Sequence, residues 1–402
     1  MATSSTEGFI GRGVLLVGHA AGMLDLVSMP LWVGILIQFR HMSALQAGLL
    51  ITAYMTGVFF TSVALAPRFD RLPARAIAIA GFVLGALAFL AIVQVDGFAT
   101  LLSVHFVAGI GAGSALSMVH GTISRSREPH RVFAIANFGV AIFSIVFFTT
   151  VPAAVQRNPD ILFYVLSGLL VFGAAAAAIA FPKPPAEIVE RFRQATGGNT
   201  GSLRIALILA FVGVTLQSAG QGEIYAFLER IGAWRGFSAA SIGNMLAVSG
   251  LLNLIAPIAA ALLENVVPRI RAICIGLCIH ACFAALASNS PVFLTYAAGG
   301  SLLVFMSIFN HTFMFGAISK LDPSGRTASS TPAMLMLGAA VGPALGGAVA
   351  QFIGFSAIGT MSAVILIASA ACFVLIGSLR MPALQHEATG ERRFDQSLKP
   401  RH

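Results

Sequence analysis

The sequence predicts an all-α membrane protein with twelve transmembrane helices in two parallel six-helix repeats. Three observations predict this fold: the composition, the distribution of basic residues and an internal duplication. Of the 402 residues, 57% are hydrophobic and only 10% are charged, whereas a soluble domain carries about 25% charged residues. Apolar runs of roughly 20 to 27 residues recur along the chain, and about 20 apolar residues cross a ~30 Å hydrocarbon core as a helix.

Twelve apolar runs are long enough to span a membrane. The first run is too long for the hydrophobic region of a cleavable signal peptide, so we expect it to remain as the first helix. The predicted spans, with ends set to within several residues, are 13–39, 44–66, 74–95, 99–124, 132–156, 161–181, 204–229, 238–263, 269–288, 292–318, 327–353 and 355–379.

Lys and Arg residues lie mainly on one side of the alternating loops. With the N-terminus inside, 20 of the 24 fall on the inner side, and only Arg40, Arg157, Arg230 and Arg235 fall on the outer side. Cytoplasmic loops of membrane proteins carry such an excess of basic residues. We therefore expect an integral protein of the plasma (inner) membrane with both termini in the cytoplasm. The net charge of +9 then reflects topology and anionic headgroups, and nucleic-acid binding is not expected.

The two halves of the chain align at a nearly constant shift. The segment 43–48 matches 238–243 and the segment 122–131 matches 317–326, both at a shift of 195 positions, and near the first helix the shift is 198. An even number of spans per repeat makes the repeats parallel, related by an axis along the membrane normal. The expected organisation is an N-terminal six-helix half at 1–181, a cytoplasmic linker at 182–202, a C-terminal six-helix half at 203–380 and a cytoplasmic tail at 381–402.

Asp25 and Glu223 are the only acidic residues well inside the predicted spans, and no Lys or Arg lies there. They occupy equivalent positions in the two repeats, on spans one and seven. A charge at the centre of a bilayer costs ~3 kcal/mol or more, so such acids usually face a cavity, a partner or a proton path. Burial disfavours the charged form of a carboxyl group. We therefore expect at least one of the pair to couple transport to protons or to bind a cationic substrate; the alternative is a structural hydrogen bond between helices.

The loop after span two reads Ala66-Pro-Arg-Phe-Asp70-Arg71-Leu-Pro-Ala-Arg75. It resembles a degenerate form of the G-x-L-x-D-R-x-G-R-[RK] motif of the major facilitator superfamily, and with twelve spans and two parallel repeats the whole chain resembles that superfamily. The resemblance implies a cytoplasmic gate made by Asp70, Arg71 and Arg75, with Arg131 on the next cytoplasmic loop as a candidate partner. The alternative is a charged, solvated turn.

The chain departs from the superfamily pattern in two spans. Many antiporters of the superfamily carry a G-x(3)-G-P-x-x-G-G run in span five, but here that run lies in span eleven, from Gly338 to Gly347. Many relatives carry an Arg before the Gly pair of span four, where this chain has His105. Both departures count against a drug/proton antiporter.

Polar residues within the spans gather on one, four, seven and ten, which line the central cavity in the superfamily. Asp25 shares a helix face with Met29 and Trp32 at i, i+4 and i+7, and an acid, a thioether and an indole together suit an amphipathic or aromatic solute. Packing is the alternative for Met29 and Trp32, and a bond between helices is the alternative for each His. The expected substrate contacts are Trp32, Met29, Tyr54, His105, Asn137, Gln217, Gln221, Asn310 and His311.

The predicted function is proton-coupled secondary transport of a small organic molecule, by rocking of the two halves about a midplane site. Efflux of an amphipathic or cationic compound is favoured, because the spans hold two acids and no fixed cation; the alternative is uptake of an aromatic or carboxylic metabolite by proton symport. An enzyme is not expected, because no nucleophile–base or metal constellation is visible. We expect no cofactor and no metal site, and a monomer whose partners are the solute, protons and the lipid bilayer.

Overall fold

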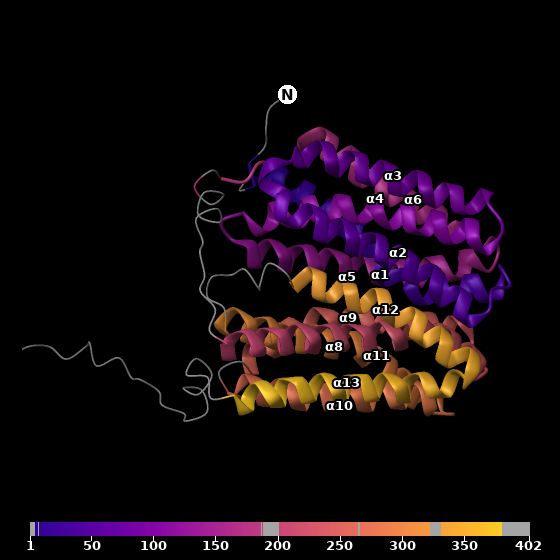
Figure 1. The fold of residues 1–402 in the computed structure, drawn as a ribbon. Coiled ribbons are helices and arrows are strands. Elements are labelled where there is room, and N and C mark those ends of the chain that lie inside the picture. The colour runs from indigo at the N-terminus through magenta and orange to yellow at the C-terminus, as the bar shows by residue number, and fades with distance from the viewer. Residues whose placement is uncertain are drawn as a thin grey trace, which may run out of the picture.

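The computed structural model describes residues 5–6, 8–185, 187, 201–263, 266–321 and 331–379. Twelve helices in this part of the chain are long and apolar enough to cross a membrane, and they lie roughly side by side (Figure 1). Most of the predicted linker and tail, at 188–200 and 380–402, lies outside the described residues. The helices are α1 (Phe9–Gln38), α2 (Ala44–Leu65), α3 (Ala74–Gln94), α4 (Phe98–Ser124), α5 (Pro129–Val155), α6 (Ile161–Ala180), α8 (Gly201–Trp234), α9 (Ala239–Leu263), α10 (Arg269–Asn289), α11 (Phe293–Leu321), α12 (Thr331–Phe352) and α13 (Phe355–Ser378).

The helix boundaries follow the predicted spans closely, except at the end of α8. That helix was expected to end near Glu229, but it continues through Arg230 to Trp234. The guanidinium of Arg235 lies over the Trp234 ring, 4.5 Å from its centroid. An amphipathic ring and a basic side chain are both favourable at a membrane–water interface. The helix can therefore extend beyond the apolar residues from which its end was predicted.

The same helix pairs pack in both halves. The pairs α3–α4, α2–α4, α3–α6, α1–α6 and α1–α5 recur as α10–α11, α9–α11, α10–α13, α8–α13 and α8–α12. The contacts between the halves are symmetric as well, because α2 packs on α12 as α5 packs on α9, and α1 meets α8. The predicted fold of two parallel repeats is confirmed, whereas the boundaries assigned to the halves stay a prediction.

The halves are joined at the end of the bundle that holds the connections 39–43 and 235–238, here called the distal end (right in Figure 1). Gly48 of α2 faces the carbonyl oxygen of Pro343 on α12, and a Cβ added to Gly347 would lie 2.5 Å from the carbonyl oxygen of Ala44. Small residues at such a crossing let two membrane helices approach backbone to backbone. Hydrogen bonds add to the closure: Leu45 N to Gln351 Oε1 (3.2 Å), Ala344 N to Thr52 Oγ1 (3.1 Å), Arg230 Nη1 to Gln38 Oε1 (3.4 Å) and the Tyr225 hydroxyl to Val27 O (3.2 Å).

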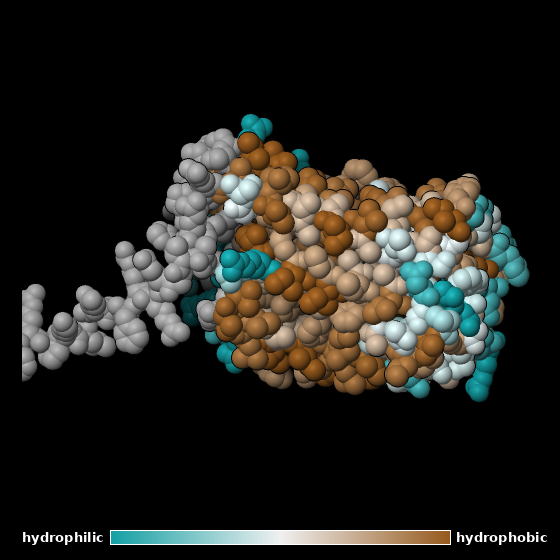
Figure 2. All heavy atoms as spheres, turned by 90° about the horizontal axis from the view of Figure 1, so that it is seen from below, coloured by the Kyte–Doolittle hydropathy of each residue, from teal (hydrophilic) through white to brown (hydrophobic). Residues whose placement is uncertain are grey.

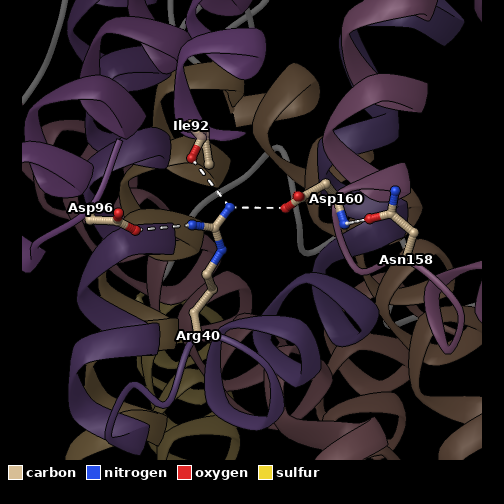
Figure 3. A network of polar contacts seen from close by, with 5 residues as sticks. All are labelled: Arg40, Ile92, Asp96, Asn158 and Asp160. Atoms are coloured by element: carbon tan, nitrogen blue, oxygen red, sulfur yellow. Dashed lines mark hydrogen bonds and ion pairs between the residues drawn. The ribbon is translucent and has the colours of Figure 1, made fainter. Parts of the chain in front are cut away.

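Arg40 ties together the loops of the N-terminal half at the distal end (Figure 3). Its Nη2 lies 2.9 Å from Asp160 Oδ1 and 3.5 Å from the carbonyl oxygen of Ile92, and its Nη1 lies 3.5 Å from Asp96 Oδ1. Asp160 lies in the loop after α5, Ile92 lies in the last turn of α3, and Asp96 lies in the loop after α3. One guanidinium therefore connects three segments. The bond to Asp160 is the better protected of the two ion pairs, because the Asp96 side chain is fully exposed. Such a connection favours movement of these helices as one rigid unit.

The outer surface of the bundle is apolar. Figure 2 shows brown, hydrophobic residues over most of the visible face, with teal residues gathered towards its ends. Large apolar side chains such as Leu294 (76% exposed), Ile179 (73%) and Leu262 (72%) point outward. Exposed apolar patches of this extent mark a surface that is covered in the native setting, which here is the hydrocarbon of the bilayer.

The orientation in the membrane stays a prediction, and labelling can test it. The basic bias places the linker in the cytoplasm, so a cysteine at position 196 or 198, in a background without the four native cysteines, should not react with an impermeant maleimide in intact cells. It should react after the cells are permeabilised. Rapid labelling of either site in intact cells would reverse the orientation.

Candidate functional site

Asp25 lies in the middle of α1 and is buried, with 6% of its surface exposed. The hydroxyl group of Tyr54 on α2 donates a hydrogen bond to its carboxyl group. The other carboxyl oxygen, Oδ1, is buried and has no hydrogen-bond partner among the described residues. The carboxyl group is therefore only half satisfied by the protein, and a proton, a water or a cation can occupy the remaining position.

The face of α1 that carries Asp25 is directed into the N-terminal half. Trp32 is fully buried there, and its ring centroid lies 5.2 Å from that of Tyr54 and 5.4 Å from that of His105. Phe89 and Phe163 complete this aromatic cluster. His105 is itself fully buried, and its Nδ1 contacts the carbonyl oxygen of Leu101 at 2.7 Å.

Two expected substrate contacts, Met29 and Trp32, were predicted to line a cavity wall, but the structure places them in a packed core. Met29 (2% exposed) and Trp32 (0%) lie in the core of the N-terminal half, and His105 stacks on Trp32. In this conformation the cluster holds the α1 segment beside Asp25 in place. Helix periodicity identifies which residues share a face, but not whether that face meets a cavity or another helix.

Glu223 on α8 is the repeat counterpart of Asp25, and it is fully buried. Neither of its carboxyl oxygens has a hydrogen-bond partner among the described residues. The glycine run of span eleven accounts for the close packing around it: a Cβ on Gly342 would lie 2.7 Å from Glu223 N, and one on Gly346 would lie 3.0 Å from Glu223 O. The run thus lets α12 pack directly against the α8 segment that carries the acid.

A polar cluster in the N-terminal half involves two histidines that were not among the expected site residues. His19 Nδ1 lies 2.9 Å from His120 Nε2, and His19 Nε2 lies 3.2 Å from Asn137 Oδ1. The Phe133 ring packs edge-on against both imidazoles. Asn137 is exposed and His120 is half-buried, so the cluster is accessible from outside the helix core. Three polar residues on spans one, four and five indicated this site, but no spacing within the sequence linked them.

The expected contacts in the C-terminal half come together inside it. Gln221 of α8 and His311 of α11 interact with His280 of α10. Gln217 of α8 bonds to Ser307 of α11. Asn310 of α11 lies against Gly276 of α10. His280 lies on span nine, which is not one of the four spans expected to line the cavity, yet it is fully buried and its Nε2 lies 2.7 Å from Gln221 Oε1.

The gate residues make their contacts within the N-terminal half. Asp70, in the short helix η1 (Ala66–Arg71), forms an ion pair with Arg125, whose Nε lies 2.9 Å from Oδ1 and whose Nη2 donates a hydrogen bond to Oδ2 at 3.2 Å. Arg131 pairs instead with Glu128 at 3.3 Å. The Arg125 guanidinium also lies over the Phe69 ring, and Arg75 donates to the carbonyl oxygen of Ala178. In this conformation the partner of Asp70 is therefore Arg125, not the expected Arg131; for Arg71 no contact is resolved.

Loss of the Asp70–Arg125 pair should weaken the packing of η1 on α4. We expect Asp70→Asn to lower the free energy of unfolding by about 1 kcal/mol, because the pair is two-pronged but partly exposed. It should also slow transport. Thermal unfolding of the purified variant measures the first effect, and Glu187→Gln, which removes an exposed partner of Arg127, is the matched control. Equal melting temperatures for Asp70→Asn and the parent would show that the Asp70–Arg125 pair does not stabilise the packing of η1 on α4.

The comparisons with known proteins agree with this fold. The Major Facilitator Superfamily profile matches residues 14–331. The crystal structure of the nucleoside transporter NupG is similar, with a TM-score of 0.69 and 15% sequence identity, over 91% of this chain and 99% of that one. A single-residue variant of NupG gives a TM-score of 0.68 over the same shares. No curated protein sequence matches. On the extent of the profile match and on its twelve-helix structure, the chain is a membrane transporter that belongs to the major facilitator superfamily, and not an enzyme.

Proposed function

We propose that this transporter is a proton-coupled secondary transporter that exports small amphipathic or cationic organic compounds by alternating access. The observation that carries the proposal is the pair Asp25 and Glu223. Both are buried in the middle of the bundle, and both have carboxyl oxygens without hydrogen-bond partners in the described part of the chain. They occupy equivalent positions in the two repeats.

The argument for a proton or a cation follows from charge. An unpaired carboxylate in a low-dielectric interior is strongly unfavourable, so the group is neutralised by a proton or by a positive partner. The described helices hold no Lys or Arg near the middle of the bundle that could act as a fixed partner. A mobile partner remains, and a site that exchanges a proton for a cationic solute has the properties of an antiporter.

Alternating access requires that each end of the bundle can close. The structure has its distal end closed by the α2–α12 and α5–α9 contacts. The transport cycle would separate these contacts and form others at the opposite end, by rocking of the halves. The acids on α1 and α8 lie on the helices that meet at the pseudo-twofold axis, so their occupancy can bias the position of one half against the other.

A second candidate function is proton symport of an uncharged aromatic metabolite. The specific observation in its favour is the accessible cluster of His19, His120, Asn137 and Phe133, which offers neutral donors and acceptors beside an aromatic ring. A nucleoside, the substrate class named for NupG, has this chemistry. A carboxylic metabolite is less suited, because the cluster has no fixed cation.

One flux measurement separates the two functions. Ethidium, a permanent cation, and uridine would be offered to proteoliposomes with the membrane potential clamped and a pH gradient in either direction. Antiport predicts that ethidium accumulates when the interior is acidic. Symport predicts that uridine accumulates when the exterior is acidic. Equal fluxes in proteoliposomes and in protein-free vesicles, for both compounds and both gradients, would contradict both functions for these solute classes.

A further inference from the structure

The C-terminal half contains a seam of polar side chains between α8, α10 and α11. We call it the C-half seam; its members are Gln217, Gln221, His280, Ser307, Asn310 and His311. Gln217 Nε2 donates to Ser307 Oγ at 3.0 Å, and His280 Nε2 contacts Gln221 Oε1 at 2.7 Å. His311 interacts electrostatically with His280, and its ring stacks on Phe315 with the centroids 5.5 Å apart.

The hydrogen bonds of the seam are incomplete. Gln217 Oε1, His280 Nδ1, His311 Nε2 and both amide atoms of Asn310 are buried without a partner among the described residues. Each such group destabilises the folded state if it stays unsatisfied. Bound water removes that destabilisation where several polar groups converge. The unpartnered polar atoms of the seam therefore favour bound water there.

The internal duplication provides a control for the role of the seam. Gly81 and Gly276 are equivalent at the shift of 195 and make equivalent contacts, since a Cβ on Gly81 would meet Ala115 and one on Gly276 would meet Asn310. At the same shifts the N-terminal half has Met23, Gly85, Ala112, Ala115 and Leu116 for Gln221, His280, Ser307, Asn310 and His311.

Only Gln217 has a polar counterpart, His19, and that ring is bonded to His120 and Asn137. At the positions equivalent to the other five seam residues, the same helix pairs thus pack in the N-terminal half without polar side chains. The fold itself does not require the seam, so its polar residues serve some other purpose.

We propose that the C-half seam is a second protonation site, in which His280 and His311 take up and release protons through bound water, separately from Asp25 and Glu223. The step is simple: a hydronium gives its proton to an unpartnered ring nitrogen, His280 Nδ1 or His311 Nε2, and water takes the proton back. Two adjacent imidazoles oppose double protonation, so the pair would hold one proton at a time.

No strong fixed charge lies in the seam itself. Apart from the two histidines, the titratable or charged groups on the packed elements are Arg204, Glu223, Tyr225, Glu229 and Arg230 on α8, Arg269, Arg271, Cys274, Cys278 and Cys282 on α10, Tyr296 and Lys320 on α11, and Cys372 on α13. Glu223 is two residues from Gln221, so it projects from a different face of α8. Arg269 lies eleven residues before His280, about three turns away. The protonation state is therefore set mainly by the seam and its water.

Nuclear magnetic resonance tests the proposal without a substrate. The protein has nine histidines, so selective ¹³C labelling of the imidazole Cε1 gives few enough signals to assign with single His→Gln variants. We expect the His280 and His311 signals to change during an acid titration that starts at about pH 8, above the ordinary histidine pKa, and extends to about pH 3. His311→Gln should shift the His280 midpoint. His41, exposed on the distal loop, gives the reference signal. If the chemical shifts of both the His280 and the His311 signals stay constant over this pH range, the proposal is overturned.

A transport measurement tests the link to function, and only here does the inference rest on the proposed function. We expect the ethidium accumulation driven by a pH gradient to be at least tenfold lower in His280→Gln than in the parent. Ethidium exchange without a gradient should persist. Gradient-driven accumulation at the parent level in His280→Gln would refute a coupling role for the seam. If the parent itself shows no gradient-driven transport, the proposed function fails, and the imidazole signals still decide whether the seam binds protons.

Discussion

Gly48→Val is expected to abolish transport by preventing closure of the distal end. Gly48 faces the carbonyl oxygen of Pro343 so closely that any Cβ would overlap a backbone atom of α12, and backbone cannot move aside as a flexible side chain can. Overpacking of this kind costs about 1–3 kcal/mol, which changes the ratio of two conformations by about fivefold to 150-fold. A carrier must pass through the closed distal state in every cycle, so transport should fall with the population of that state.

Cysteine labelling in detergent gives a direct readout of the closure. A cysteine at Thr52, whose hydroxyl accepts the Ala344 N–H across the interface, should react faster with a maleimide in Gly48→Val than in the parent. Gly168→Val on α6 is the matched control, because nothing lies within 4 Å of a Cβ there. Gly243→Val should have an intermediate effect, since its Cβ would lie 3.2 Å from Phe148 O. Parent-like labelling and transport in Gly48→Val would show that the α2–α12 crossing is not a moving contact.

Asp25→Asn is expected to uncouple transport from protons. The substitution keeps the size of the side chain and its ability to accept from the Tyr54 hydroxyl, but it removes the group that can gain or lose a proton. Accumulation of ethidium driven by a pH gradient should fall at least tenfold, whereas exchange of ethidium between equal concentrations should persist. Both fluxes can be measured with the same proteoliposomes.

Asp96→Asn is the control for this variant. It makes the same chemical change in a fully exposed loop residue that contacts Arg40 at 3.5 Å, and both fluxes should match the parent. If Asp25→Asn kept gradient-driven accumulation, Asp25 would have only a structural role, and Glu223 would remain as the candidate coupling group.

The sequence predicts the number and limits of the helices and their organisation in two repeats well, because each depends on a strong physical signal. The length of apolar runs is set by bilayer thickness, and a duplication forces matching helix pairs. The match of Gly48 with Gly243 was visible in the sequence. That the two glycines face Pro343 and Phe148, which are themselves 195 positions apart, emerged only from the structure.

The candidate site was less predictable, for a reason specific to membranes. Lipid tails and neighbouring helices are both apolar, so periodicity gives little indication of which face of a helix meets protein. The position of Trp32 in the N-terminal core and of His280 inside the C-terminal half could not be read from spacing. Likewise, the bond from Arg125 to Asp70 depends on how η1 turns after α2, which the loop motif does not specify.

Proton release during solute uptake is the decisive measurement for proton-coupled export. Proteoliposomes in a weakly buffered medium, with no initial pH gradient and with the membrane potential clamped, would receive external ethidium while an electrode records the pH of the medium. Antiport predicts acidification of the medium as ethidium enters, abolished by an uncoupler and absent in Asp25→Asn. Entry of ethidium with no change in pH, or with alkalinisation of the medium, would contradict proton-coupled export.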